Sequence, residues 1–469
     1  MATTATKFAT STSIAQGAIV VGSGLAGLSA ASQLISHGVP VHLLDRAQKP
    51  GGNSIKASSG INGAPTRFQT VPDTTFYDDT VRSAGSVFSI AREQRQKLVS
   101  TLTEQSASAI YWLHDEKGVD LSKVAQLGGH SVPRTHRPEK STVGASIVMT
   151  LLKQLKESPL FQLETAARVT RVLKSGEKVT GVEYTQDGET KELHGPLVFA
   201  TGGFAGDANG LLAKYRPDLA GYPSTSDPRE GTQDLLTAVG AQLLDMEQVQ
   251  VHPTGFVDPK EPQSLAKILA AEVLRGEGGV LLMEGKRFVN EMETRAHITD
   301  AITKHEPLKG DIKQWDVLIV LDEGTFKAAE THLGFYMWKG LMRKTTVAEL
   351  GEGVLPALQE YADAAAGHTE DRFGRKAFGH WALKKVEPET LVYVGNVTPV
   401  VHFTMGGVVI NERSEVLDAE GKAIPGLWAA GEVTGGVHGE NRLGGSSLLE
   451  CVVFGRIAGD QASAAFKSQ

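Results

Sequence analysis

The chain has 469 residues, of which 41% are hydrophobic and 22% charged, and a formal net charge of −7 at pH 7. This length predicts two or three domains with an ample core, and the acidic balance argues against a nucleic-acid-binding surface. The single cysteine, Cys451, excludes an internal disulfide, a thiolate-ligated iron–sulfur cluster and a C-x-x-C-H haem attachment within this sequence. We assign no metal site.

The N-terminal segment 1–16 is rich in Ser, Thr and Ala, with Lys7 as its only basic residue. A mitochondrial presequence normally carries arginines and a secretory signal needs an apolar core, so we predict a disordered tail. Residues 393–411 lack Asp, Glu, Lys and Arg, but Asn396, Pro399 and His402 argue against a membrane helix there. We expect a cytoplasmic protein without an integral membrane segment, and a mitochondrial location stays open.

Residues 18–45 have the pattern of a strand, a glycine-rich turn, a helix and a second strand. The apolar run 18–21 leads into Gly-Ser-Gly-Leu-Ala-Gly, and the second strand ends at an aspartate. In this context G-x-G-x-x-G predicts a dinucleotide site, because the glycines let a pyrophosphate approach the helix N-terminus and the acid can hold ribose hydroxyls. A glycine-rich turn without a ligand is the alternative. The residues assigned to the cofactor here are Gly22, Gly24, Leu25, Ala26, Gly27 and Asp45.

A second glycine-rich stretch follows at 51–64. Small residues and exposed backbone N–H groups directly after the ribose-binding acid suit a flavin ring and its phosphates better than a nicotinamide. The sequence therefore favours FAD over NAD. The residues assigned to FAD in this stretch are Gly52, Asn53, Ser54, Ser59, Gly60 and Asn62.

The remaining elements predict a dinucleotide domain that is interrupted and then completed. Helical spacing at 74–118 precedes strand patterns between 167 and 200, and a strand at 426–430 and a helix at 447–466 close the chain. Residues 247–402 carry no dinucleotide signal. We predict an α/β fold: a Rossmann-like FAD-binding domain at 17–246 and 403–469, interrupted by an inserted α+β capping domain at 247–402, with the active site between them. Further cofactor contacts are expected at Val169, Thr201, Gly202, Ser447 and Leu448, and core positions at Trp112, Leu113, Tyr336 and Trp338.

Five cationic or imidazole side chains lie in glycine-rich or apolar runs where burial is expected: His252, Arg275, Arg295, His402 and Arg442. Burying an unpaired cation costs several kcal/mol, so anions must share the space. Internal carboxylates would supply them, and so would a substrate with two carboxylates. The residues alone leave both readings open.

Six ordered motifs between residues 17 and 460 resemble the flavoprotein subunits of succinate dehydrogenases and fumarate reductases, and most nearly the single-chain fumarate reductases of fungi and trypanosomatids. The motifs are Gly-Gly-Asn-Ser at 51–54 with Ser-Gly-Ile-Asn at 59–62, Gln-Val-His-Pro-Thr-Gly at 250–255, Ala-Glu-Val-Leu-Arg-Gly at 271–276, Arg-Phe-Val-Asn-Glu at 287–291 with Thr-Arg at 294–295, His-Phe-Thr-Met-Gly-Gly at 402–407, and Gly-Gly-Val-His-Gly at 435–439 with Asn-Arg-Leu-Gly-Gly at 441–445.

The resemblance implies a role for each cation. His402 and Arg442 would bind one carboxylate of fumarate, and His252 and Glu272 would lie at the other. Arg295 matches the proton donor of the family, and Glu272 and Arg275 match the relay that restores its proton. Glu432 matches an acid that contacts FAD.

The chain also departs from the family pattern. Asn53 occupies the place of the histidine that carries FAD covalently in membrane-bound relatives, so we expect FAD to be non-covalent. Residues 228–234 lack the usual Thr-Gly-Asp-Gly, and Glu230 is a candidate replacement for its acid. Since no haem, iron–sulfur or second dinucleotide motif is visible, a free reduced flavin or another small donor is expected to reduce the FAD.

Three functions stay open at this point. The first is reduction of fumarate to succinate by hydride transfer from FAD N5 and proton donation from Arg295. The second keeps the fold and changes the substrate, to aspartate or to another activated alkene such as urocanate. The third is a non-catalytic FAD-binding protein. The oligomeric state is not predicted.

Overall fold

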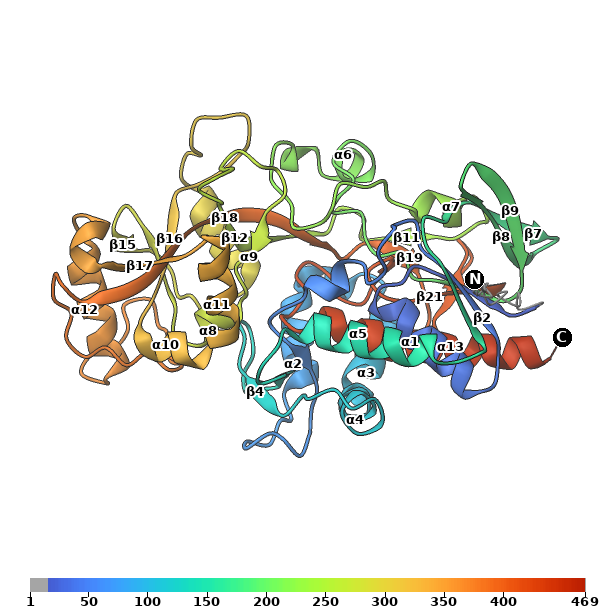
Figure 1. Ribbon diagram of the computed structural model, residues 1–469, viewed down its shortest axis with the longest axis horizontal. Helices are drawn as coiled ribbons and strands as arrows, with labels where there is room; N and C mark the ends of the chain where they lie inside the picture. The colour runs from blue at the N-terminus through green and yellow to red at the C-terminus, as the bar shows by residue number, and fades with distance from the viewer. Residues whose placement is uncertain (1–15, 469) are drawn as a thin grey trace, which may run out of the picture.

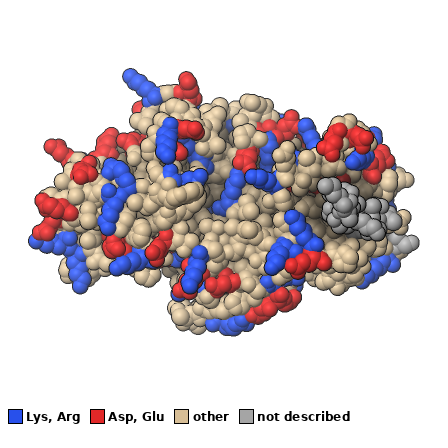
Figure 2. All heavy atoms as spheres, viewed as in Figure 1, with Lys and Arg blue, Asp and Glu red and all other residues tan. Residues whose placement is uncertain are grey.

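The computed structural model describes residues 16–468, so the tail expected at 1–16 lies almost wholly outside the described residues. Two large sheets lie toward opposite ends of the elongated molecule, with helices α1, α5 and α13 on the side of the first sheet (Figure 1). Figure 2 shows acidic and basic side chains intermingled over one face, without an extended patch of one sign.

The first sheet is a parallel sheet of apolar strands with one antiparallel edge strand. Strand β1 has all four residues buried, as expected for a strand covered on both faces. Only β20 runs antiparallel to its neighbour. The strand order is β20 (Glu415–Leu417), β21 (Ala423–Ala429), β10 (Leu197–Phe199), β1 (Ala18–Val21), β2 (Val41–Leu44) and β6 (Phe161–Glu164).

Helix α1 (Leu25–Ser36) packs between α5 (Val143–Lys156) and the C-terminal helix α13 (Ser446–Lys467). Glycines make the contact with α13 close, because a Cβ at Gly455 would lie 2.6 Å from the Ala26 carbonyl oxygen. A Cβ at Gly459 would meet the Ala30 carbonyl oxygen at the same distance. The first and last helices of the described chain are therefore held together through bare backbone.

The expected helical stretch at 74–118 is divided into several pieces. Gly85 and Ala91 have positive φ values of 66° and 51°, which a continuous helix does not allow. The pieces are α2 (Phe76–Ala84), α3 (Arg92–Glu104), α4 (Ser106–Tyr111) and a π-helical turn at Trp112–Glu116.

The described chain also forms three small sheets of three strands each. Their strands are β7 (Arg168–Ser175), β8 (Lys178–Gln186) and β9 (Glu189–His194); β3 (Ile61–Asn62), β5 (Thr135–Arg137) and β4 (Lys123–Ala125); and β11 (Leu243–Leu244), β19 (Gly407–Val409) and β22 (Thr434–Gly435). Two short helices, α6 (Leu211–Tyr215) and α7 (Gln233–Thr237), lie in the connection to the second large sheet.

The second large sheet is antiparallel and draws all its described strands from residues 249–404. Its order is β13 (Ile268–Leu269), β12 (Val249–Phe256), β18 (Leu391–Thr404), β16 (Val317–Leu321), β14 (Val280–Met283) and β15 (Lys286–Arg287), and β17 (Arg343–Thr346) also pairs with β18. The helices in this part are α8 (Val273–Gly276), α9 (Arg295–Thr303), α10 (Glu323–Ala328), α11 (Glu330–Lys339) and α12 (Val354–Ala365).

Strand β18 joins the two halves of the molecule. Its first half pairs with β16 and β17, and its second half pairs with β12. At its end the Thr404 N–H donates to Glu432, which follows strand β21 of the first sheet. His402 lies near this junction, so the fold places it between the two large sheets.

The core prediction for Trp338 is wrong, since its side chain is 76% exposed, whereas Trp112, Leu113 and Tyr336 are buried as expected. Trp338 is two residues beyond Tyr336 on α11, and a two-residue step turns a side chain to nearly the opposite face of a helix. No helix among the described residues combines the length and apolar character that a bilayer crossing requires.

Candidate functional site

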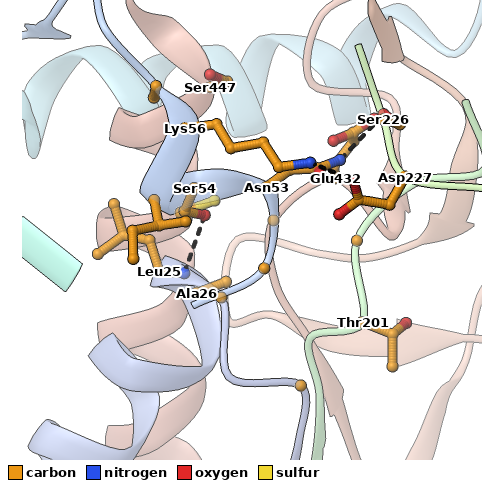
Figure 3. A pocket seen from close by; sticks show the side chains of 18 of the residues that line it. Leu25, Ala26, Asn53, Ser54, Lys56, Thr201, Ser226, Asp227, Glu432 and Ser447 are labelled. Carbon is orange, nitrogen blue, oxygen red and sulfur yellow. Dashed lines mark hydrogen bonds and ion pairs between the residues drawn. The ribbon is translucent and has the colours of Figure 1, made fainter. Parts of the chain in front are cut away.

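A cavity of about 860 Å³ is lined by residues from both halves of the chain. Its size lies within the range of roughly 300–1,000 Å³ that is typical of ligand sites. Figure 3 shows the part around Leu25, Ser54 and Glu432. The predicted cofactor residues that line it are Gly22, Gly24, Leu25, Ala26, Asp45, Gly52, Asn53, Ser54, Ser59, Gly60, Val169, Thr201, Gly202, Glu432, Ser447 and Leu448.

The turn after β1 brings bare backbone to the cavity wall. Gly22 has φ +106°, and a Cβ there would lie 2.3 Å from the carbonyl oxygen of Ala200 on the neighbouring chain segment. The N–H of Leu25, in the first turn of α1, donates to Ser54 Oγ at 3.0 Å, as drawn in Figure 3. Asp45 accepts from the backbone N–H groups of Ser23 and Ala47, each at 2.8 Å. This arrangement fits the pyrophosphate and ribose of a dinucleotide.

Two predicted cofactor residues, Gly27 and Asn62, are not among the lining residues. A Cβ at Gly27 would lie 1.9 Å from the Gly22 carbonyl oxygen, so this glycine serves the packing of the helix against the turn. The amide of Asn62 donates to the Gly444 carbonyl oxygen at 2.7 Å and to Ser446 Oγ at 3.0 Å. Asn62 therefore ties the second glycine-rich stretch to the start of α13.

A polar bridge crosses one side of the cavity. Asn53 Nδ2 donates to Ser226 Oγ at 3.0 Å, and Lys56 Nζ lies 2.7 Å from Asp227 Oδ1 (Figure 3). Asn53 Oδ1 and Arg229 Nε are buried without a hydrogen-bond partner in the protein. Unpaired buried groups beside glycine-lined walls fit a polar cofactor such as FAD, which would supply their partners.

Glu432 is an acidic group on the cavity wall. Its Oε1 accepts from the Thr404 N–H at 2.9 Å. Burial raises the pKa of Glu432 to about 7, and the Thr404 hydrogen bond lowers it only in part. Glu230, the candidate replacement for the missing aspartate, lines the cavity but forms an ion pair with Arg168, with its side chain 70% exposed.

The structure brings the five cationic or imidazole side chains together at one end of the cavity. Arg295 is the first residue of α9, and its Nε donates to Glu272 Oε2 at 2.6 Å. The same carboxylate lies 4.0 Å from Arg275 Nη2 and 4.0 Å from His252 Nε2. The His252 and His402 rings, on strands β12 and β18, lie 5.3 Å apart. One carboxylate is therefore shared among three of the five groups.

The cavity wall includes Arg295, His402 and Arg442, whereas His252, Glu272 and Arg275 do not line it. His402 Nδ1 is 2.9 Å from Thr225 Oγ1. In the described part of the chain no carboxylate oxygen comes within ion-pairing distance of Arg442, and its Nε has no hydrogen-bond partner. Two cationic side chains, Arg295 and Arg442, thus face a space that holds too few protein anions.

Burial and the neighbouring arginines shift the pKa values of the groups in this cluster. Burial raises the pKa of Glu272, but Arg295 and Arg275 outweigh burial and hold it at about 2. Burial, with the neighbouring Arg295, lowers the pKa of Arg442 to about 9 and keeps the pKa values of His252 and His402 well below 6.5. At neutral pH both histidines are therefore uncharged hydrogen-bonding groups, and the site attracts an anion.

The sequence analysis missed Gln250. Its Oε1 accepts from Arg295 Nη1 at 2.7 Å, and its Nε2 donates to the Arg442 carbonyl oxygen at 2.9 Å. A signal was present, because Gln250 lies two residues before His252 and alternate residues of a strand share a face. Thr225 carried no such signal, since its partner His402 is 177 residues away.

Comparison with known proteins agrees with this geometry. Residues 17–448 match the family model described as "FAD binding domain". The chain is 42% identical to "Fumarate reductase" of Schizosaccharomyces pombe, over 97% of this chain and 91% of that protein. It is also 42% identical to "Fumarate reductase 1" of Saccharomyces cerevisiae, over 94% and 97% of the two chains. The chain belongs to the fumarate reductase family of FAD-binding flavoproteins.

A solved structure of this family supports the fold. The open conformation of a flavocytochrome c3 fumarate reductase superposes with a TM-score of 0.73 at 33% identity, over 96% of this chain and 78% of that one. The expected α/β architecture of a FAD-binding flavoprotein is confirmed, and FAD is the cofactor of this oxidoreductase.

Proposed function

We propose that the protein reduces fumarate to succinate. The observation that carries the proposal is the charge of the site: Arg295 and Arg442 face the cavity, and Glu272 is the one carboxylate that pairs with the buried cations there. A dicarboxylate would supply the missing negative charge. The relatives named fumarate reductase support the same substrate.

Reduced FAD supplies the hydride when it is bound. The negative charge that develops on the substrate is enolate-like and spreads onto one carboxylate, so positive donors at that carboxylate stabilise the transition state. Arg442 presents a planar fork of N–H donors for this purpose, and neutral His402 adds a hydrogen bond. His252 would bind at the other carboxylate, on the side where Glu272 lies.

Arg295 would donate the proton to the substrate carbon. An arginine is a weak acid, with an ordinary pKa above about 12, so it needs a neighbour that replaces the lost proton at once. Glu272 touches Arg295 and approaches Arg275 to 4.0 Å, which is the order required for a relay. The Gly128 N–H, which donates to Glu272 Oε1 at 2.9 Å, holds this carboxylate in place.

We further propose that residues 247–402 close as a cap over the FAD-binding domain at 17–246 and 403–469. Arg295, Glu272 and His252 come from the cap, whereas Arg442 and the cofactor residues come from the FAD-binding domain. Closure would therefore assemble the site. FAD would be bound without a covalent link, and a free reduced flavin or another small donor would reduce it.

The decisive experiment is reoxidation of chemically reduced protein. Fumarate should return the flavin absorbance with stoichiometric formation of succinate, while the alkenes urocanate and acrylate should not match its rate. Aspartate oxidation would run in the other direction, so aspartate added to the oxidised protein should not bleach the flavin. Faster reoxidation by urocanate than by fumarate would show that urocanate is the better substrate and would overturn the assignment of fumarate. Reduced protein that no alkene reoxidises, together with oxidised protein that aspartate does not reduce, would support the non-catalytic reading.

A further inference from the structure

Arg442 is held differently from the other buried arginines of the described chain. Arg295 pairs with Glu272, Arg134 with Asp73 and Arg95 with Asp245, each at 2.6 Å or less. Arg442 is 2% exposed and has no such partner. Its guanidinium carbon instead lies 4.3 Å from the centre of the Phe403 ring.

Phe403 is itself fixed by its surroundings. It follows His402 on β18, is 5% exposed, and is the register partner of Gln250 on β12. The His438 ring meets the Phe403 ring edge-on, with centroids 5.7 Å apart and an interplanar angle of 75°. His438 in turn binds Glu450 of α13 at 2.8 Å, and both of these side chains are buried.

The loop between β22 and α13 therefore contacts the same ring twice, through His438 and through Arg442 four residues later. Gln250 also holds this loop, because its side chain donates a hydrogen bond to the Arg442 carbonyl oxygen. The backbone and the guanidinium of Arg442 are both anchored to one register position of the β12–β18 pair.

The chemical nature of the group beside Arg442 determines whether its guanidinium can bind a substrate carboxylate. A carboxylate beside Arg442 would occupy its N–H donors and compete with a substrate carboxylate. An aromatic face attracts the cation, yet it accepts none of the in-plane hydrogen bonds. The ring therefore does not satisfy the N–H donors of the buried guanidinium, which stay available to an anion.

We propose that Phe403 is a positioning residue, which holds the Arg442 guanidinium through its ring so that the N–H donors remain free for a substrate carboxylate, with His438 and Glu450 fixing the ring. The inference deepens the proposed function and rests on it for the identity of the ligand.

The first test is malonate binding to the FAD-loaded enzyme, followed by flavin absorbance. Phe403→Met keeps the side-chain volume and removes the ring, and it should weaken malonate binding roughly 5- to 30-fold. kcat/KM for fumarate should fall by at least a similar factor, because Arg442 also faces the charge that develops in the transition state. Phe403→Leu should behave like Phe403→Met, and Phe403→Tyr, which keeps the ring face, should stay near wild type.

Phe326→Leu is the matched control, because Phe326 stacks on Tyr393 at 4.2 Å and does not line the cavity. It should lower the melting temperature and leave malonate affinity unchanged. In an Arg442→Ala background, Phe403→Met should weaken malonate binding no further.

Two results would overturn the inference while leaving the proposed function intact. One is an FAD-loaded Phe403→Met enzyme with wild-type malonate affinity. The other is an effect of Phe403→Met that is equally large without Arg442, which would make the ring a general packing element. A wild-type enzyme that binds no dicarboxylate would instead overturn the proposed function itself.

Discussion

At the scale of single residues, the site is defined by how each guanidinium is satisfied. Arg295 is bound on one side by Glu272 and on the other by Gln250, so its position is fixed before a ligand arrives. Arg442 is fixed by a ring and a backbone contact, and its N–H donors stay free. We expect the two arginines to differ when they are removed: loss of Arg295 should lower turnover with little effect on ligand binding, whereas loss of Arg442 should weaken binding as well as turnover.

Arg295→Ala should retain the fold, FAD and most of the malonate affinity, and should lose nearly all turnover. A general acid typically contributes about 10²–10⁴-fold, and the loss should be at least that large once the proton relay is cut. Stopped-flow reoxidation of reduced flavin by fumarate, beside a melting curve, measures both quantities. A stable, FAD-loaded variant with near wild-type rate would falsify the assignment of Arg295 as proton donor.

Arg442→Ala should weaken the binding of fumarate and of the unreactive dicarboxylate malonate together. The loss should be roughly 2–5 kcal/mol, because a buried substrate carboxylate would be left without its charged partner. Titration with malonate, followed by flavin absorbance, gives the dissociation constant. Arg413→Ala, at an exposed arginine that binds Gln461 away from the cavity, is the control. Unchanged malonate affinity would refute the role of Arg442.

At the scale of elements, glycines decide where backbone meets backbone and where it meets the cofactor. The strand–turn–helix at 18–36 could be predicted because its signal is local: three glycines at fixed spacing between an apolar strand and a helix pattern. Contacts between distant segments could not be predicted from such signals. Asn62 shows this, since its partners Gly444 and Ser446 are more than 380 residues away, and a flavin contact was expected there instead.

Gly27→Ala should destabilise the protein and deplete its FAD. The added Cβ would lie 1.9 Å from the Gly22 carbonyl oxygen, so α1 or the phosphate-binding turn must shift. The matched control is Gly334→Ala in α11, where no atom lies within 4 Å of the added Cβ and alanine favours the helix by about 1 kcal/mol. FAD content after gel filtration and the melting temperature of both variants decide the matter.

At the scale of the whole molecule, two sheets share one cofactor space, and the long strand β18 belongs to the second sheet while its end is bonded to Glu432 beside the first. The sequence predicts a domain boundary after residue 246, because dinucleotide motifs stop there and resume late, and this boundary stays a prediction. It did not predict the exposed Trp338, since hydrophobicity alone does not tell which side of a short helix faces solvent.

Acid precipitation should release the FAD into the supernatant, because Asn53 occupies the place of the linking histidine and binds Ser226 instead. Absorbance of the supernatant and of the redissolved pellet gives the partition. Yellow colour that remains with the pellet would show a covalent flavin, and mass spectrometry of peptides would then locate it.

The pH dependence of stability should contain a contribution from Glu432. Its pKa is raised from 4.5 to about 7, so the folded protein retains a proton that the unfolded chain has released in this window. Stability that is present below pH 4.5 is therefore lost as the pH rises toward 7 and above. Glu432→Gln keeps an acceptor for Thr404 and should show a flatter melting temperature between pH 5 and 7.5, measured on flavin-stripped protein. Glu389→Gln, on the surface, should leave the slope unchanged.

The single thiol of the chain has a consequence for measuring cofactor exchange. Cys451 lies on α13 and lines the same cavity as the flavin site. Burial raises the pKa of its thiol well above the usual range, and Glu450 and Glu432 act in the same direction. A thiol that stays protonated reacts slowly, and a flavin lying against α13 would shield it further. The rate at which a fluorescent maleimide labels Cys451 should therefore report how fast the flavin leaves. The sequence has no second thiol, so all of the label measures this one site.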